Sequence, residues 1–310
     1  MDLNAWRRRR ISEPAYRWAR KAMPPLSPTE REAIEAGDTW WDADLFTGNP
    51  DWRKLLDVPA ATLTPDEQRF IDGPVAQLCA MLDEWDITWH RRDLPPEVWA
   101  FLKAQRFFGM IIPKRYGGLG FSPYAHSEVV RRISAYSITT GVTVMVPNSL
   151  GPGELLLQFG TPAQRDYWLP RLADGREVPC FGLTSPEAGS DAASMVDTGI
   201  VCRQVVDGRE LIGVRLNWHK RYITLGPVAT VLGLAFKMSD PDGILGGARD
   251  IGISVALVPT DAPGVEIGRR HLPAMQVFQN GPNRGHDVFV PLDALIGGAE
   301  RAGHGWQMLM

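Results

Sequence analysis

The stretch "FGLTSPEAGSDAASM", residues 181–195, marks the point where the character of the chain changes. It begins inside the apolar run 178–183 and turns abruptly into small polar residues around a single proline and a single glycine. Five polar side chains fall within eight residues: Thr184, Ser185, Glu187, Ser190 and Asp191. A plain turn needs far fewer. A loop that binds a polar ring or an anionic group is one interpretation, and an ordinary surface loop is the other.

On the N-terminal side of this stretch, residues 64–178 predict a bundle of several helices. "TPDE" at 64–67 has the form of a capping box, and the same helix-starting pattern recurs at Ser122 and Thr161. The apolar positions behind the first cap repeat at helical spacing: Ile71, Val75, Leu78 and Leu82. Residues 137–160 are nearly uninterrupted apolar sequence with Gly and Pro, so we expect a buried helix, a turn and another helix.

On the C-terminal side, residues 179–295 predict a β-domain. Asp207-Gly208 lies between two β-prone runs and is a strong hairpin signal. Short apolar runs follow, separated by Gly, Pro and Asp, with no helical pattern between them. This succession predicts an antiparallel sandwich or barrel of about a hundred residues. The fold class is therefore α+β, with an N-terminal α-helical bundle followed by the β-domain.

The two ends of the chain differ from its middle. Residues 1–63 predict a basic arm followed by an irregular strap, because seven basic and two acidic residues give the first 23 residues a net charge of +5. Trp6, Tyr16 and Trp18 lie among these charges, so the arm could bind an anionic membrane surface or pack on its own protein or a partner subunit. Residues 296–310 look like the start of an apolar-faced helix, and we expect further chain beyond Met310.

Composition excludes several classes of protein. Of 310 residues 44% are hydrophobic and 22% charged, and the net charge of −3 provides no general attraction to nucleic acid. Three cysteines far apart fit neither a disulfide framework nor a metal pair, which predicts a reducing, cytoplasmic location. No membrane-spanning run, signal peptide, dinucleotide fingerprint or phosphate loop is visible, and the six histidines lack metal-ligand spacing.

A second candidate segment lies in "NWHKRYITLGP", residues 217–227. Tyr222 and Thr224 are two apart, so on a regular strand both would point to the same face. An aromatic ring beside a hydroxyl suits a planar ring ligand, which needs a surface to pack on and a hydrogen-bond partner. An ordinary half-buried strand is the alternative interpretation.

The order of these parts resembles the acyl-CoA dehydrogenases. A helical domain is followed by "LTSPEAGSD", a hairpin, "KRYIT", "GISVALVP", "GPNRGHDVFVP" and "GHGWQML", so the resemblance covers about residues 64–310. The sequence of these motifs is most similar to that of the bacterial long-chain enzymes of fatty-acid β-oxidation. The resemblance implies that residues 296–310 begin a C-terminal four-helix domain that the sequence lacks.

The resemblance also implies where FAD and substrate bind. The implied cofactor-binding residues are Phe181, Leu183, Thr184, Ser190, Tyr222, Ile223 and Thr224. Ser190 and Arg284 match positions close to the acyl-CoA. Two motifs depart from the family pattern, because Ser185 replaces a glutamate and Tyr222 replaces a tryptophan. No catalytic base can be assigned, since the family glutamate is expected beyond Met310, and no metal is expected.

The implied activity is FAD-dependent α,β-dehydrogenation of medium- or long-chain fatty acyl-CoA to trans-2-enoyl-CoA. The implied partners are the acyl-CoA, an electron-transferring flavoprotein and, at full length, a second subunit of a homodimer. We expect this fragment to be inactive by itself. Two alternatives stay open: an acyl-CoA oxidase that passes electrons to oxygen, and a non-catalytic binding or assembly module. The location would be cytoplasmic, with the arm allowing contact with the inner membrane.

Overall fold

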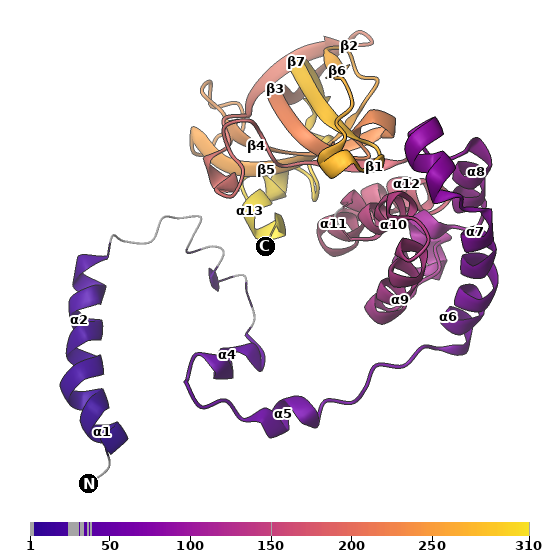
Figure 1. The fold of residues 1–310 in the computed structure, drawn as a ribbon. Coiled ribbons are helices and arrows are strands. Elements are labelled where there is room, and N and C mark those ends of the chain that lie inside the picture. Colours follow the sequence, from indigo (N-terminus) through magenta and orange to yellow (C-terminus); the bar gives the residue numbers. More distant parts are fainter. Residues whose placement is uncertain are drawn as a thin grey trace.

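The computed structural model describes residues 3–23, 31, 34–35, 37, 39–149 and 151–309, and shows a helical domain beside a curled sheet (Figure 1). The helices are α1 (Leu3–Arg7), α2 (Glu13–Ala22), α4 (Asp42–Leu45), α5 (Trp52–Leu56), α6 (Pro65–Phe70), α7 (Ala76–Met81), α8 (Pro96–Ala104), α9 (Pro123–Ser134), α10 (Ile138–Met145), α11 (Pro152–Phe159), α12 (Pro162–Ala173) and α13 (Gly305–Leu309). The strands are β1 (Pro179–Gly182), β2 (Thr198–Val206), β3 (Arg209–Thr224), β4 (Val231–Ser239), β5 (Asp250–Pro259), β6 (Val265–Ile267) and β7 (Asn280–Pro291).

The helix signals in the sequence are confirmed. Thr64 begins α6 in a capping box with Glu67, Thr161 begins α12 in the same way, and Ser122 caps α9. The predicted apolar face of α6–α7 is buried at Ile71, Val75 and Leu78 and half-buried at Leu82. Helices α10 and α11 form the expected helix, turn and helix. These caps satisfy backbone N–H groups that would otherwise lack partners, which is why such local patterns start helices reliably.

The predicted fold class, a helical bundle followed by a β-domain, is confirmed, although the sheet is mixed rather than antiparallel throughout. Its order is β1-β4-β2-β3-β7-β6, and β5 pairs with β4. Strand β4 is parallel to both β1 and β2, while the other pairs are antiparallel. The prediction assumed that each short strand reverses direction. Instead, β1 and β2 run the same way, one after the other, along a single edge of β4.

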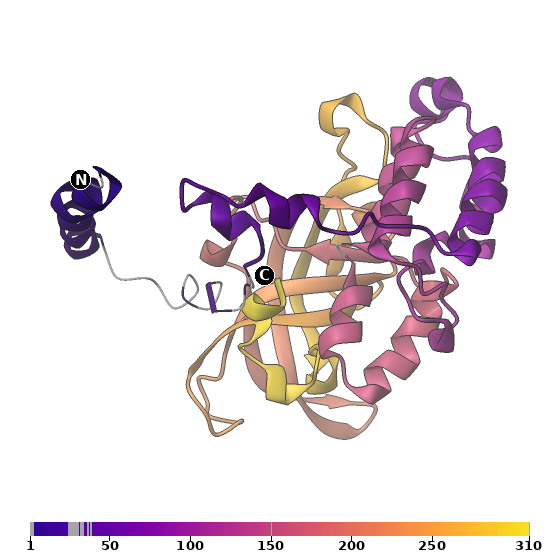
Figure 2. The same ribbon diagram turned by 90° about the horizontal axis from the view of Figure 1, so that it is seen from below.

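The loop of residues 183–197 is the connection between these two collinear strands. β1 pairs with residues 231–234 of β4, and β2 resumes the pairing at residues 237–239. The polar stretch therefore leaves the sheet edge and returns to it a few residues further along. The predicted hairpin is confirmed between β2 and β3, which pair antiparallel. Asp207 and Gly208 both have positive φ, as the tight turn between these strands requires. Figure 2 shows the resulting curved sheet from below.

One buried apolar cluster runs continuously from the helical domain into the sheet. It includes Leu78 and Val98 from the helices together with Val214 and Phe236 from the sheet. A second cluster joins α11 and α12 to β4 and β5. The helical domain and the sheet therefore share a core, which fixes α11 next to β1.

The N-terminal arm is helical and exposed in the part that the structure describes. α1 and α2 are joined by a π-helical turn, Arg8–Ser12, and none of the residues 4–23 is buried. The predicted irregular strap contains the short helices α4 and α5, but part of it, including residues 24–30, lies outside the described residues, as does Met310. No helix in the described part of the chain is long and apolar enough to cross a bilayer.

Candidate functional site

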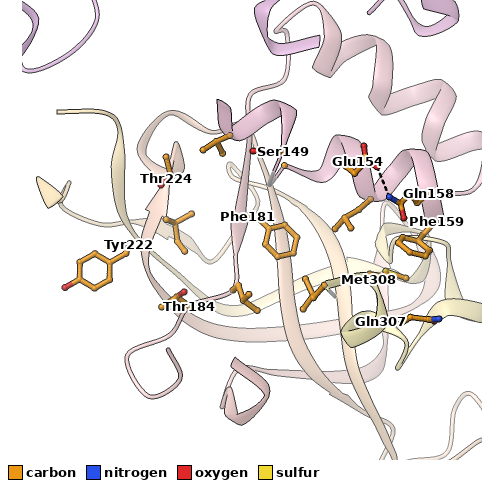
Figure 3. Close-up of a pocket in the computed structure, with 16 residues that line it drawn as sticks. Ser149, Glu154, Gln158, Phe159, Phe181, Thr184, Tyr222, Thr224, Gln307 and Met308 are labelled. Carbon is orange, nitrogen blue, oxygen red and sulfur yellow. Dashed lines mark hydrogen bonds between the residues drawn. The ribbon is translucent and has the colours of Figure 1, made fainter. Parts of the chain in front are cut away.

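A cavity of about 500 Å³ opens where the helical domain, the sheet and α13 meet (Figure 3). Its volume lies in the range typical of small-molecule sites. Four segments line it: the region from α10 to α11, the end of β1, the end of β3, and α13. Their lining residues are Val146, Ser149, Gly151, Glu154, Leu155, Gln158, Phe159, Phe181, Leu183, Thr184, Tyr222, Ile223, Thr224, Gln307, Met308 and Leu309.

The structure thus brings both sequence-predicted segments to one cavity, and a backbone hydrogen bond holds them together. The N–H of Arg221 donates to the carbonyl oxygen of Thr184 at 3.0 Å. Phe181 is positioned by the lack of a side chain at Gly233, where an added Cβ would lie only 2.7 Å from the Phe181 ring. The ring therefore packs directly on the backbone of β4 and projects at the centre of the cavity wall in Figure 3.

A β-bulge shapes the second segment. The register of β3 against β7 shifts between Lys220 and Ile223, and Tyr222 has a left-handed φ of 58°. The bulge interrupts the regular alternation on which the predicted shared face of Tyr222 and Thr224 was based. The bulge buries Ile223 and leaves Tyr222 exposed, yet all three residues line the cavity. Bulges of this kind re-aim side chains beside functional sites.

The hydroxyl of Thr224 is oriented by a buried asparagine. The Nδ2 group of Asn280 donates to Thr224 Oγ1 at 3.2 Å and to the carbonyl oxygen of Tyr222 at 3.1 Å. Asn280 Oδ1 lies 3.3 Å from Nδ1 of His271, whose ring centroid is 4.8 Å from that of Tyr222. Since Thr224 Oγ1 already accepts a hydrogen bond, its own proton is available to an acceptor in the cavity.

The first segment also presents hydrogen-bonding groups to the cavity. Within the described part of the chain, no group accepts a hydrogen bond from the backbone N–H of Leu183 or Thr184, and the Thr184 hydroxyl makes none. Half-buried polar groups of this kind are usually paired. Two N–H donors and two hydroxyls around one cavity fit a heteroaromatic ring with carbonyl and nitrogen acceptors, such as the flavin that the resemblance implies.

Two predicted residues are not brought to the cavity. Ser190 is exposed in the loop of residues 183–197, and Arg284 is exposed on β7. The cavity touches β3 at residues 222–224, whereas Arg284 pairs with His219, which precedes them on the strand and does not line the cavity. Their roles near a substrate stay predictions.

Sequence analysis missed Glu154, Asn280 and His271. Glu154, in the first turn of α11, is the carboxylate that lines the cavity in the described part of the chain, and it accepts a 2.7 Å hydrogen bond from Gln158 Nε2. An isolated acid within the long apolar stretch 137–160 was the available signal. For Asn280 and His271 there was none, because their contacts depend on the pairing of distant strands.

The cysteine next to the site is not activated as a nucleophile. Burial raises the pKa of Cys180, next to Phe181, to about 12, so this thiol stays protonated and is a poor nucleophile. Within the described residues, no group of three or more His, Cys, Asp or Glu side chains is arranged to bind a metal ion.

Comparison with known proteins gives a consistent family. The chain matches "Acyl-CoA dehydrogenase, N-terminal domain" over residues 66–176 and "Acyl-CoA dehydrogenase, middle domain" over residues 180–281. It is 34% identical over 275 residues to a probable acyl-CoA dehydrogenase, FadE10, of Mycobacterium tuberculosis, an alignment that covers 86% of this chain and 40% of that protein. It is 30% identical over 232 residues to the human mitochondrial very long-chain specific acyl-CoA dehydrogenase, covering 73% and 34%.

Solved structures show the same fold. Butyryl-CoA dehydrogenase from Megasphaera elsdenii superposes with a TM-score of 0.68 at 23% identity, covering 81% of this chain and 62% of that one. The chain spans about 40% of the length of the first curated relatives that it matches.

Proposed function

Because this chain belongs to the acyl-CoA dehydrogenase family, whose members bind FAD, we propose that its cavity holds the flavin of an FAD-dependent fatty acyl-CoA dehydrogenase. The reaction would be α,β-dehydrogenation of a fatty acyl thioester. The observation that carries the proposal is the meeting of residues 181–184 and 222–224 at one cavity, tied by the hydrogen bond from Arg221 N–H to Thr184 O.

Four groups would hold the flavin. The N–H groups of Leu183 and Thr184 and the Thr184 hydroxyl would donate to ring acceptors, and the Thr224 hydroxyl, oriented by Asn280, would donate from the other segment. Tyr222 and Phe181 would supply flat apolar contact. When bound, FAD supplies the two-electron redox chemistry, and the protein binds, orients and excludes water.

The other side of the cavity supports an apolar substrate. Val146, Leu155 and Phe159 line it next to the carboxylate of Glu154. A medium- or long-chain acyl group suits such a surface, and removal of the Cα proton requires a base, for which a glutamate beyond residue 310 stays our prediction. An electron-transferring flavoprotein as acceptor and assembly as a homodimer are further parts of this proposal.

The N-terminal helix supports a location at a membrane surface. Ala15, Trp18, Ala19 and Ala22 recur at helical spacing on one face of α2. Arg17, Arg20 and Lys21 lie on the opposite face. The exposed fractions of Tyr16 and Trp18 are 66% and 73%. A basic amphipathic helix with exposed aromatics binds anionic lipid. We propose a cytoplasmic protein that binds the inner membrane peripherally.

Two measurements test the catalytic proposal. The protein should take up FAD and gain absorbance at about 450 nm, and in a longer protein that includes the predicted glutamate that band should bleach when a fatty acyl-CoA is added without oxygen. Acyl chains of increasing length would define the preference. Protein that stays colourless with excess FAD contradicts the proposal and favours a binding or assembly module. Rapid peroxide release in air would instead identify an oxidase.

A further inference from the structure

Lys220 is a completely buried lysine placed between the two segments of the site. It lies on β3, two residues before Tyr222, and its side chain is 0% exposed while that of its partner Asp197 is 1% exposed. The side chain passes beneath β1 through a gap left at Gly182, where an added Cβ would lie 3.2 Å from Lys220 Cγ. A lysine is almost never buried in this way without specific partners.

The partners of Lys220 are the two ends of the loop of residues 183–197. Its ammonium donates to the carbonyl oxygen of Leu183 at 2.9 Å, where the loop begins, and to the carboxylate of Asp197, where it ends. Asp197 also accepts from Ser185 Oγ at 2.9 Å and from the backbone N–H of His219 at 2.9 Å. Both carboxylate oxygens are therefore occupied, and the loop is closed at its base by one network.

This network fixes the direction of a peptide plane at the cavity. In a trans peptide, the carbonyl of Leu183 and the N–H of Thr184 point in opposite directions. When Lys220 holds that carbonyl in the interior, the Thr184 N–H must point the other way. The next peptide follows the same logic, because Thr184 O accepts from Arg221 and the N–H of Ser185 donates to Ala188 O at 3.1 Å.

We propose that Lys220 is a positioning residue for the cofactor: by holding the Leu183 carbonyl, it aims the Thr184 N–H at an acceptor of the flavin ring. The proposal rests on the proposed function, since it assumes that the cavity holds a flavin. The buried pair of Lys220 and Asp197 would touch no ligand itself. It would instead control the direction in which the Thr184 N–H points. Such pairs are costly to bury and are weak explanations of stability alone.

The informative variant is Lys220→Met with Asp197→Asn. Methionine fills a similar volume without a charge, and asparagine still offers an oxygen to His219 N–H, so no unpaired charge stays buried. Lys220→Met alone leaves the buried carboxylate of Asp197 without its positively charged partner, so this single variant serves only as a comparison. The control is Lys237→Met, a lysine with an exposed side chain on β4, a strand that does not pair with β3.

FAD binding, the visible absorption spectrum of the bound flavin and the unfolding temperature would be measured for each protein. The double variant should fold, bind FAD about tenfold more weakly and show a shifted flavin spectrum, because one oriented donor is lost. Lys237→Met should match the wild type in all three. A folded double variant with unchanged affinity and spectrum would overturn the positioning role and leave the proposed function intact. A wild type that takes up no FAD would instead remove the proposed function.

Discussion

Thr224 shows how a single hydroxyl acquires a defined role. Asn280 donates to its oxygen, so the Thr224 proton is directed to another acceptor, and the bulge at Tyr222 turns the segment toward the cavity. Asn280 lies on β7, far from Thr224 in the sequence, and the bulge arises in the pairing of β3 with β7. The chemistry available at this position is therefore set by two strands together.

Thr224→Val should weaken FAD binding about tenfold without unfolding the sheet, because valine keeps the branched shape and loses the donor. FAD titration followed by flavin absorbance would measure the change. Thr198→Val, at an exposed position on β2, is the matched control and should leave affinity unaltered. Equal affinity in Thr224→Val and the wild type would remove Thr224 from the set of cofactor ligands.

Among the structural elements, α6 and α9 are joined at their first turns by one carboxylate. Glu67 is buried, and its two oxygens accept from the backbone N–H groups of Thr64 and Ser122, each at 2.7 Å. Burial acts to raise the pKa of Glu67, but these hydrogen bonds outweigh it and lower the pKa below its ordinary value of 4.5. A capping box that reaches a second helix cap is a tertiary contact as well as a local one.

This lowered pKa has a direct consequence for stability against acid. The contribution of the Glu67 carboxylate to the free energy of unfolding is complete above about pH 4.5. It is lost as the pH falls through the lower pKa of the folded state. Glu67→Gln should therefore cost about 2 kcal/mol at pH 7, and this difference from the wild type should shrink near pH 3. Urea unfolding at both values measures it.

Glu128→Gln is the control for that experiment, because Glu128 forms an exposed ion pair with Arg131 on α9. Surface pairs of this type contribute little, so its unfolding midpoint should stay close to that of the wild type. A Glu67→Gln protein as stable as the control at neutral pH would show that the shared cap is not significant.

The helix α2 carries the membrane proposal, and its basic face can be tested directly. Replacing Arg17, Arg20 and Lys21 together by glutamine should weaken binding to vesicles of anionic lipid about 100-fold, at about 1 kcal/mol for each charge. Co-sedimentation with the vesicles measures the bound fraction.

Vesicles of neutral lipid, and raised salt, should abolish most of the binding of the wild type as well. Replacing Arg69, Arg131 and Arg176 by glutamine removes the same charge from exposed ion pairs elsewhere and is the matched control. If both triple variants bind as the wild type does, α2 is not a lipid-binding helix.

For the whole molecule, the decisive feature is that helices and sheet share a core. Gln164 on α12 adds a polar link across that boundary. Its Nε2 donates to the carbonyl oxygens of Asp293 at 2.7 Å and Leu295 at 2.6 Å, and its Oε1 accepts from Gly297 N–H at 3.0 Å. The cavity lies along the same boundary, so anything that separates the two domains should also disturb the site.

Gln164→Leu should lower the free energy of unfolding by about 3 kcal/mol, because several buried backbone groups lose their partners. Helical circular dichroism and tryptophan fluorescence should report one coincident transition in variant and wild type, since the core is continuous. Gln68→Leu, exposed on α6, is the control. Two separate transitions in the wild type would contradict the shared core.

The sequence by itself determined the local features: the helix caps at Thr64, Ser122 and Thr161, the hairpin at Asp207-Gly208, and the family resemblance that selected residues 181–184 and 222–224. These local features depend on residues only a few positions apart, and the covalent chain already holds such residues close together. Only the tertiary structure decided the strand directions, the bulge at Tyr222, and the buried contacts of Lys220 and Asn280. They depend on the register of strands far apart in the sequence, which the packing of the whole core sets.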